Sequence, residues 1–402
     1  MKNLFSLIAI LFLSQSLFSE EVLNETVYWE LTRVDTKIEE KKFDEAEDIL
    51  RRWYKKNWRS RSYNKAVIAR TYGFFLFQRE RFDEALEKLQ TAYDENALPL
   101  AEATSLVQAM AQLYSSQGNP SQAKRLLLDF IDKAESNPKP VPGMHNVYAI
   151  TALIFASEKD YDVAYYYINL AISLSSAFRE DWYQLKFAIE YNREDFLNAE
   201  ISAKELLLNK PDNKRYYIQL SAIYNILEKY DLSLATIEVS YMKGLLEKPE
   251  EFTNLASFYL YKKNPAMSAR VLENAISNEN IIFDKANAKL LSDAWLFAKE
   301  RSKSLEVLER SLDAEPNDPK LINQYINIAF SAFEWDEVIN GIFMAKKNGF
   351  KDDGKHSLML GIAYFEKKNL KSSEDSFIEA LNSKKYADQG KAWLEYLEAL
   401  KG

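Results

Sequence analysis

The sequence predicts an all-α solenoid of about ten helical hairpins, and three observations support this prediction. The tetrapeptide Phe-Asp-Glu-Ala occurs twice, at Phe43–Ala46 and at Phe82–Ala85. Small or apolar residues then recur along the chain at a similar spacing. The 402 residues include only ten glycines and ten prolines, which is few for a chain of tight β-hairpins. A hydrophobic content of 47% allows a large buried core.

Each repeated unit places a small or apolar residue near the start of its second helix. These residues are Ala46, Ala85, Ala123, Ala164, Ala199, Ser233, Ser268, Ser304, Val338 and Ser373. Successive members are separated by 39, 38, 41, 35, 34, 35, 36, 34 and 35 residues. Leu89 and Ala92, four and seven positions after Ala85, are typical of one apolar helix face. A spacing of about 34 residues between units is the period of the tetratricopeptide repeat.

The first helix of most units also has a small residue, which favours close approach of the two helices. These positions are Gly73, Ala111, Ala152, Ser221, Ala256, Ser292 and Gly361. An aromatic residue often follows three positions later and is expected to pack against the next repeat: Tyr114, Phe155, Tyr224, Tyr259, Trp295 and Tyr364. The amphipathic segment at residues 387–400 predicts a capping helix for the open end.

The N-terminus predicts export. Residues 1–19 contain one lysine, an apolar run too short to span a bilayer comfortably and a Ser-rich end, which together are typical of a cleaved signal peptide. An uncleaved anchor is the alternative. Residues 20–135 are expected to form N-terminal repeats and residues 144–402 the C-terminal repeats and cap. The Pro-rich stretch at residues 136–143 predicts a stiff loop, and we interpret it as a bend.

Composition excludes several classes of chemistry. The chain has no cysteine, which excludes disulfides, thiolate metal sites and thiol nucleophiles. A net charge of −8 gives no basic face for nucleic acid. No phosphate-binding loop, nucleophile elbow or zinc-protease motif occurs. We therefore expect neither an enzyme nor a cofactor or metal site. A hydrolase would require a reactive constellation that the sequence does not show.

The remaining polar candidates have structural interpretations. His145 and His356, the two histidines of the chain, lack partners at metal-ligand spacing and are expected to be solvated surface residues. Carboxylate pairs such as Asp83 and Glu84 are part of the repeated sequence motif. We expect them at a solvated helix start, where the helix dipole favours acids.

Three segments carry a narrower resemblance. TYGFFLFQRERFDEALEKLQTA, LSAIYNILEKYDLSLATIEVSYMKGLL and LGIAYFEKKNLKSSEDSFIEALNSKKYADQGKAWLEYL resemble exported tetratricopeptide proteins associated with TonB systems of Gram-negative bacteria. The resemblance implies a right-handed superhelical solenoid, a periplasmic location and a role in TonB-linked nutrient uptake. It implies protein partners, TonB or its inner-membrane motor proteins.

The same resemblance places a partner-binding groove along the first helices. Its residues are Phe74, Phe77, Gln108, Gln112, Gln184, Tyr191, Asn192, Asn225, Tyr261, Phe297, Asn323, Asn327 and Phe330. Amides could hydrogen-bond an extended peptide backbone and aromatics could pack its side chains. The alternative is a neutral surface with packing inside each repeat. The Lys and Asn pattern of carboxylate-clamping relatives is missing, and Lys289 stands one helical turn from Asp293.

One basic cluster departs from the acidic background. It comprises Arg51, Arg52, Lys55, Lys56, Arg59 and Arg61, interleaved with Trp53, Tyr54 and Trp58. One interpretation is that the aromatic residues pack into the first repeats while the charges are solvated. The other is a docking patch for an acidic protein segment or for peripheral contact with an anionic membrane surface.

The sequence thus predicts a non-enzymatic periplasmic scaffold or adaptor that binds protein partners, as an accessory component of a TonB energy-transduction system. A scaffold in outer-membrane or secretion assembly is an alternative. So is a binding module for glycans or peptidoglycan, which would use aromatic side chains as stacking platforms.

Overall fold

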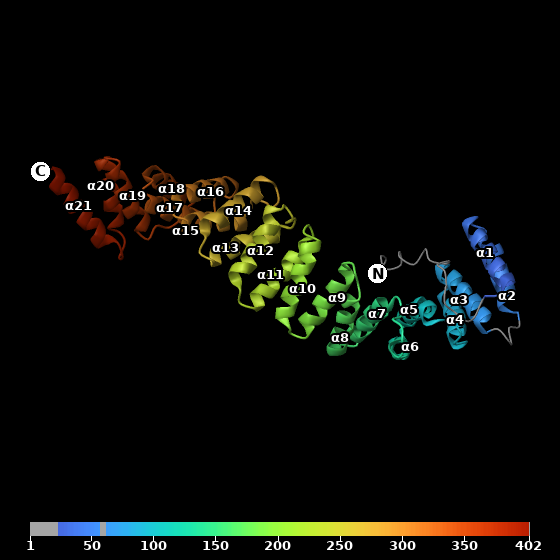
Figure 1. Cartoon of the computed structure of the whole chain (residues 1–402). Helices are drawn as coiled ribbons and strands as arrows, with labels where there is room; N and C mark the ends of the chain where they lie inside the picture. The colour runs from blue at the N-terminus through green and yellow to red at the C-terminus, as the bar shows by residue number, and fades with distance from the viewer. Residues whose placement is uncertain (1–22, 57–61, 402) are drawn as a thin grey trace. The chain divides into compact units, whose positions relative to one another are not determined.

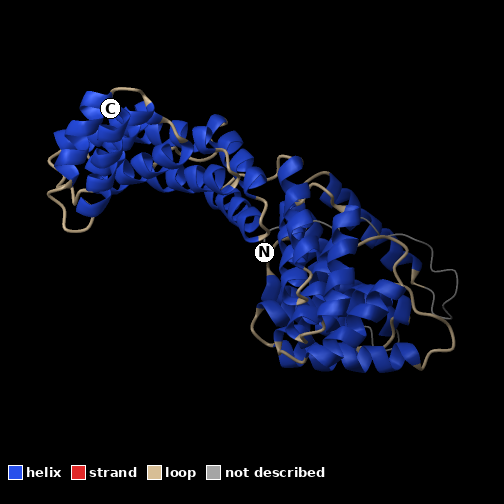
Figure 2. Ribbon diagram, turned by 90° about the vertical axis from the view of Figure 1, so that its left-hand side faces the viewer, coloured by secondary structure: helices blue, strands red, loops and turns tan. Residues whose placement is uncertain are grey.

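The computed structural model describes residues 23–56 and 62–401 of the chain. Throughout these residues the regular secondary structure is α-helical (Figure 2), and Figure 1 labels the helices in chain order. The predicted all-α class is therefore confirmed. The predicted signal peptide at residues 1–19 lies outside the described residues, as do Trp58, Arg59 and Arg61.

The chain divides into two compact units, Met1–Lys210 and Pro211–Gly402. Helices of the first unit are α1 (Glu25–Glu39), α2 (Phe43–Tyr54), α3 (Ser62–Gln78), α4 (Phe82–Asp94), α5 (Leu100–Ser116), α6 (Pro120–Glu135), α7 (Met144–Ser157), α8 (Tyr161–Ser173), α9 (Glu180–Asn192) and α10 (Phe196–Asn209). Helices of the second unit are α11 (Lys214–Ile226), α12 (Tyr230–Met242), α13 (Pro249–Tyr261), α14 (Pro265–Ser277), α15 (Lys285–Phe297), α16 (Arg301–Ala314), α17 (Pro319–Ala332), α18 (Trp335–Lys347), α19 (Lys355–Glu366), α20 (Leu370–Ala380) and α21 (Ala387–Lys401).

Among the described residues, consecutive helices pair into ten hairpins, from α1 with α2 to α19 with α20. Within each unit the second helix of one hairpin packs against the first helix of the next. We call the first helix of a hairpin helix A and the second helix B. This arrangement is a solenoid of helical repeats, as the sequence predicts.

Small residues form the contact inside the hairpins, except in α17 with α18, where Val338 takes this position. All ten residues predicted near the start of helix B are fully buried, from Ala46 to Ser373. The helix-A residue twelve positions earlier faces this contact. A Cβ atom on Gly73 would lie 2.5 Å from Cδ2 of Leu89, so the close approach of α3 and α4 requires glycine there. In α11 and α12 the corresponding Oγ atoms of Ser221 and Ser233 lie 2.7 Å apart.

The turn from helix A to helix B has one geometry throughout the described repeats. One residue per turn adopts a positive φ: Lys41, Glu80, Gly118, Lys159, Glu194, Glu228, Lys263, Lys299, Phe333 and Lys368. The next residue donates its backbone N–H to the carbonyl five positions earlier, as in Asn264 to Tyr259 at 2.8 Å. This is the hydrogen bond of a Schellman helix end. It reverses the chain in three residues and starts helix B at a fixed position.

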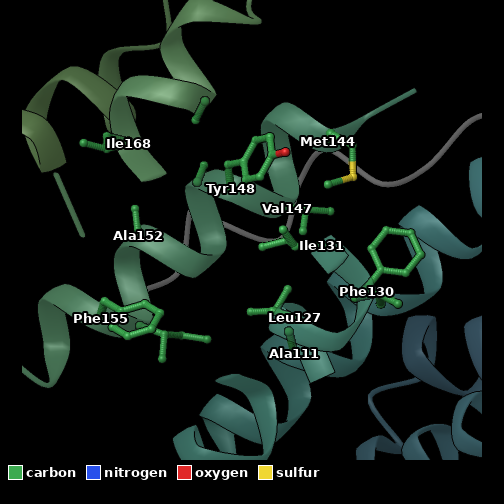
Figure 3. Close-up of a cluster of buried hydrophobic side chains, with 14 of the residues drawn as sticks. Ala111, Leu127, Phe130, Ile131, Met144, Val147, Tyr148, Ala152, Phe155 and Ile168 are labelled. Atoms are coloured by element: carbon green, nitrogen blue, oxygen red, sulfur yellow. The ribbon is translucent and has the colours of Figure 1, made fainter. Parts of the chain in front are cut away.

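The core of each unit consists of hydrophobic clusters that span successive hairpins. Figure 3 shows one section of it in the first unit, where Leu127 and Ile131 of α6 lie against Val147 of α7. The loop at residues 136–143 lies inside this unit. Thr104 Oγ1 donates to the carbonyl of Pro142 at 3.2 Å, which ties the loop to α5.

Helix α21 covers the last hairpin. The ring of Trp393 stacks on Phe377 of α20, with centroids 5.3 Å apart and planes 11° from parallel. Leu397 is also buried, at 1% exposure. The predicted capping helix is therefore confirmed. Among the described residues, no helix combines the length and apolar character needed to cross a bilayer.

Candidate interaction surface

The predicted groove residues of the first unit are only partly available. Phe74 is buried in the core. Phe77 is half-buried and packs edge-on against Phe82, with centroids 5.7 Å apart. Gln108 donates to the carbonyl of Gly143 at 3.4 Å and Gln184 to Glu180 at 3.4 Å, so both amides have internal partners.

Other groove candidates of this unit lie near the ends of helices A. Gln112 is half-buried in α5. Tyr191 and Asn192 are exposed at the end of α9. The Asn192 side chain donates to the carbonyl of Ala188 at 2.7 Å, and Tyr191 packs edge-on against Phe196. The structure therefore leaves Tyr191 as the exposed aromatic candidate of the first unit.

In the second unit, hydrogen bonds between hairpins occupy the predicted amides. Asn323 Oδ1 lies 2.8 Å from Nε2 of His356, and Asn327 Oδ1 accepts from Lys355 Nζ at 2.6 Å. Their amide nitrogens donate to carbonyls of their own helix, α17. Lys289 pairs with Asp293 at 2.5 Å, as the sequence suggests. Asn323 and Asn327 thus link successive helices A, whereas the Lys289–Asp293 pair lies within α15.

The exposed members of the groove set in the second unit include two large aromatics. Tyr261 is 69% exposed and Phe297 is 67% exposed. Asn225 is exposed near the end of α11, whereas Phe330 is half-buried against Trp335. Water contact on most of an aromatic ring has a free-energy cost, so Tyr261 and Phe297 are the strongest candidates for partner contact.

The described part of the basic cluster combines packed aromatic side chains with exposed charges. Trp53 and Tyr54 are half-buried and pack against the first hydrophobic core. Arg51 pairs with Glu47 at 3.3 Å, and Lys56 Nζ lies 4.2 Å from the ring centroid of Trp53. The side chains of Arg52 and Lys55 are exposed.

The histidines differ from the prediction, because both are half-buried rather than solvated. His145 packs against the ring of Trp182, and His356 contacts Asn323. Burial lowers the pKa of both imidazoles. Their position between successive hairpins supplies this packing, which neighbours in the sequence do not reveal.

The acids at helix-B starts are exposed, as predicted, and they also link hairpins. Asp83 accepts from Gln117 Nε2 of the next hairpin at 2.7 Å. Asp231 pairs with Lys262 at 2.5 Å in the same way. Among the described residues, no cluster of His, Asp and Glu side chains has the arrangement of a metal site.

The structure adds a feature that the sequence reasoning missed. Large side chains stand at the turn from helix A to helix B in four consecutive hairpins of the second unit. We call Tyr230, Tyr261, Phe297 and Phe333 the turn-edge row. Tyr261 and Phe297 are the last residues of α13 and α15, and the rings of Tyr230 and Tyr261 meet edge-on with centroids 6.3 Å apart.

Phe333 extends this row into the next hairpin. It is 72% exposed and has φ of 62°, the one apolar side chain among the described non-glycine residues with positive φ. A bulky residue in this conformation is uncommon. The recurring aromatic at the end of helix A is the sequence signal that could have revealed the row.

Comparisons with known proteins give the following. No family model matches the sequence, and no curated protein matches it. A tetratricopeptide repeat protein from Parabacteroides merdae is similar with a TM-score of 0.41 and 13% identity, covering 67% of this chain and 99% of that chain. The C-terminal part of a TPR repeat-containing protein from Cytophaga hutchinsonii has a TM-score of 0.41, 12% identity and coverage of 73% and 98%.

YrrB, described as a TPR protein with an unusual peptide-binding site, has a TM-score of 0.36 and 16% identity, with coverage of 47% of this chain and 91% of that chain. These neighbours are tetratricopeptide repeat proteins. The solenoid fold of the present chain follows from its own stacked hairpins.

Proposed function

We propose that this protein is a non-enzymatic scaffold that binds a protein partner in the periplasm, as an accessory component of a TonB energy-transduction system. The observation that carries the scaffold function is the turn-edge row. Its members project from consecutive hairpins, where a partner could contact several repeats at once. Extended surfaces of this kind are what repeat arrays offer to partners.

Two further observations support a binding role over a catalytic one. Both histidines make packing or hydrogen-bond contacts between hairpins. The amides of Asn323 and Asn327 link α17 to α19. These polar groups therefore hold successive repeats against one another. The exposed aromatic side chains remain available for contact with a partner.

Export and the TonB connection rest on the sequence. The apolar run of residues 4–13 supports export, and a chain without cysteine has nothing for an oxidising compartment to crosslink. The resemblance of three segments to exported tetratricopeptide proteins supports the TonB system. Nutrient uptake is the process that this system would serve.

Site-specific photocrosslinking in cells tests the proposal. A photoreactive amino acid is placed at Tyr261, at Phe297, at Tyr191 and, as a control on a helix B outside the turn-edge row, at Phe343 of α18. We expect TonB or its inner-membrane motor proteins in the products from Tyr261 and Phe297. Products dominated by assembly factors or cell-wall enzymes would refute the TonB role and retain the scaffold. The absence of protein crosslinks from every position would refute the scaffold itself.

A further inference from the structure

We infer that the turn edge of the seventh and eighth hairpins, α13 with α14 and α15 with α16, binds an acidic, extended segment of a protein partner that carries apolar side chains. This inference rests on the proposed scaffold function and names the partner's chemistry. It places the contact at the turns between helices A and B.

The apolar half of this surface is formed by Tyr261 and Phe297. They occupy the same position in consecutive hairpins, as the last residues of α13 and α15. Each is more than two-thirds exposed. Tyr230 of the preceding hairpin packs against Tyr261 and extends the apolar surface. Side chains of an extended segment could cover these rings and remove them from water.

The charged half is formed by cations beside these rings. Lys263, Lys299 and Arg301 are exposed and make no ion pair with any described residue. By contrast, Lys262 is neutralised by Asp231 at 2.5 Å. Glu300, between Lys299 and Arg301, is the exposed acid among them, so the three cations leave an excess of positive charge. On a chain of net charge −8, this local excess favours an acidic partner by electrostatic complementarity.

The first turn of α16 also favours an acidic partner. Arg301 and Lys303 occupy it, and the acid at this helix end is the N-cap residue Glu300, whose side chain makes no capping hydrogen bond. The first turn of α4 instead contains Asp83 and Glu84, which complement the helix dipole. Cations in this position are unfavourable, and carboxylates of a bound segment would offset that repulsion.

The positive surface ends at the ninth hairpin. There Phe333 is flanked by Glu334 and by Asp336. These acids would face an anionic bilayer unfavourably if the whole turn edge lay on a membrane. A narrow segment can instead contact the seventh and eighth hairpins alone, and this favours a peptide over a lipid surface.

The probe is a fluorescein-labelled acidic peptide in which each Phe is followed by a pair of Glu residues. Its binding to the full chain is measured by fluorescence anisotropy at low and high salt. We expect saturable binding that weakens as salt screens the charges. A peptide with Lys in place of Glu is expected to bind at least about tenfold more weakly.

Two sets of variants test the two halves separately. Tyr261→Ser with Phe297→Ser removes the rings, and Lys263→Glu with Lys299→Glu and Arg301→Glu reverses the charges. Each set is expected to weaken binding of the acidic peptide by about tenfold or more. The charge-reversed variant is expected to bind the Lys-containing peptide better than the wild type does. This gain of function excludes a folding defect.

Matched controls come from the same unit. Phe343→Ser removes an exposed ring of α18 that lies outside the turn-edge row. The combination of Lys320→Glu, Lys351→Glu and Lys384→Glu reverses three exposed lysines with no ion pair among the described residues. Both controls are expected to leave peptide affinity unchanged.

Three outcomes overturn the inference: no binding of the acidic peptide, equal loss in the matched controls, or binding to phosphatidylglycerol vesicles with none to the peptide. If the inference fails while crosslinks to a protein partner form at other positions, the scaffold function stands and only the turn-edge surface is refuted. If neither experiment detects protein contact, both proposals fail.

Discussion

The Oγ atoms of Ser221 and Ser233 lie 2.7 Å apart at the buried contact between α11 and α12. Ser233 is also within 3.0 Å of the Ser221 carbonyl, to which its hydroxyl can donate. Ser292 and Ser304 repeat the arrangement at 2.8 Å. In these two hairpins the paired hydroxyls satisfy one another, so the small size of the contact is kept without an unpaired polar group.

The size of the two side chains, rather than their hydrogen bond, is therefore expected to determine how much this contact contributes to the free energy of unfolding. The double change Ser221→Ala with Ser233→Ala removes both partners and should alter the free energy of unfolding by less than about 1 kcal/mol. Ser233→Leu should destabilise the protein by about 1–3 kcal/mol, because the helices have no room for it. Urea unfolding followed by circular dichroism compares the two. A larger loss in the double alanine variant would contradict the size argument.

The C-terminal cap depends on a glycine. A Cβ atom on Gly361 would overlap the ring of Phe377, and that ring stacks on Trp393 of α21. Gly361→Ala should therefore cost about 1–3 kcal/mol through overpacking. The loss should appear first as faster hydrogen exchange in α21. Exchange in α21 that stays at the wild-type rate would show that Phe377 can move without loosening the cap.

The left-handed turn residues offer stabilising changes. Glu80 and Lys159 adopt φ values of 59° and 64°, which side chains with a Cβ atom disfavour. Glu80→Gly and Lys159→Gly should each raise the free energy of unfolding by about 1 kcal/mol. Arg125→Gly, on the exposed side of α6, is the control and should lower it by about 1 kcal/mol. Thermal unfolding with the same sign for all three variants would contradict the assignment of turn strain.

A buried acid makes the fifth hairpin sensitive to pH. Glu190 of α9 has no exposed surface, its carboxylate oxygens have no hydrogen-bond partner, and its nearest cation is Lys186 Nζ at 3.7 Å. Burial raises the pKa of this carboxyl above its ordinary value of 4.5. The folded state therefore holds the proton to higher pH than the unfolded state does, and stability falls as the pH rises above 4.5.

Glu190→Gln removes this titration. The variant should match the wild type near pH 4.5 and should be more stable near neutral pH, where the wild type must bury a charge or retain a proton. Hydrogen exchange of α9 and α10 at the two pH values measures the difference within this hairpin. A wild-type hairpin that gains protection relative to the variant as the pH rises would reverse the sign and refute the prediction.

The turn-edge row shows how far the candidate surface could be predicted. Tyr261 and Phe297 belong to the predicted groove set, because their helix position repeats in the sequence. Phe74 belongs to the same set but is buried. The difference depends on the packing of α3 between its neighbours, which a fixed offset along the helix does not specify.

The amides illustrate the same limit. Asn323 and Asn327 have the residue type and spacing of a peptide-binding face. Their partners, Lys355 and His356, lie on the next hairpin, and the contact exists because α17 and α19 are stacked. The partner of an amide is thus fixed by neighbours about thirty residues away rather than by its own helix.

The sequence by itself determined the ten hairpins and the capping helix. Close helix packing favours small residues at the contact, and this steric preference recurs as a readable period in the repeats, with Val338 of α18 as the larger exception. The tertiary structure decided which side chains stay exposed, because exposure depends on how successive hairpins cover one another. It buried Phe74, engaged Asn323, and left Tyr261 and Phe297 in water beside unpaired cations.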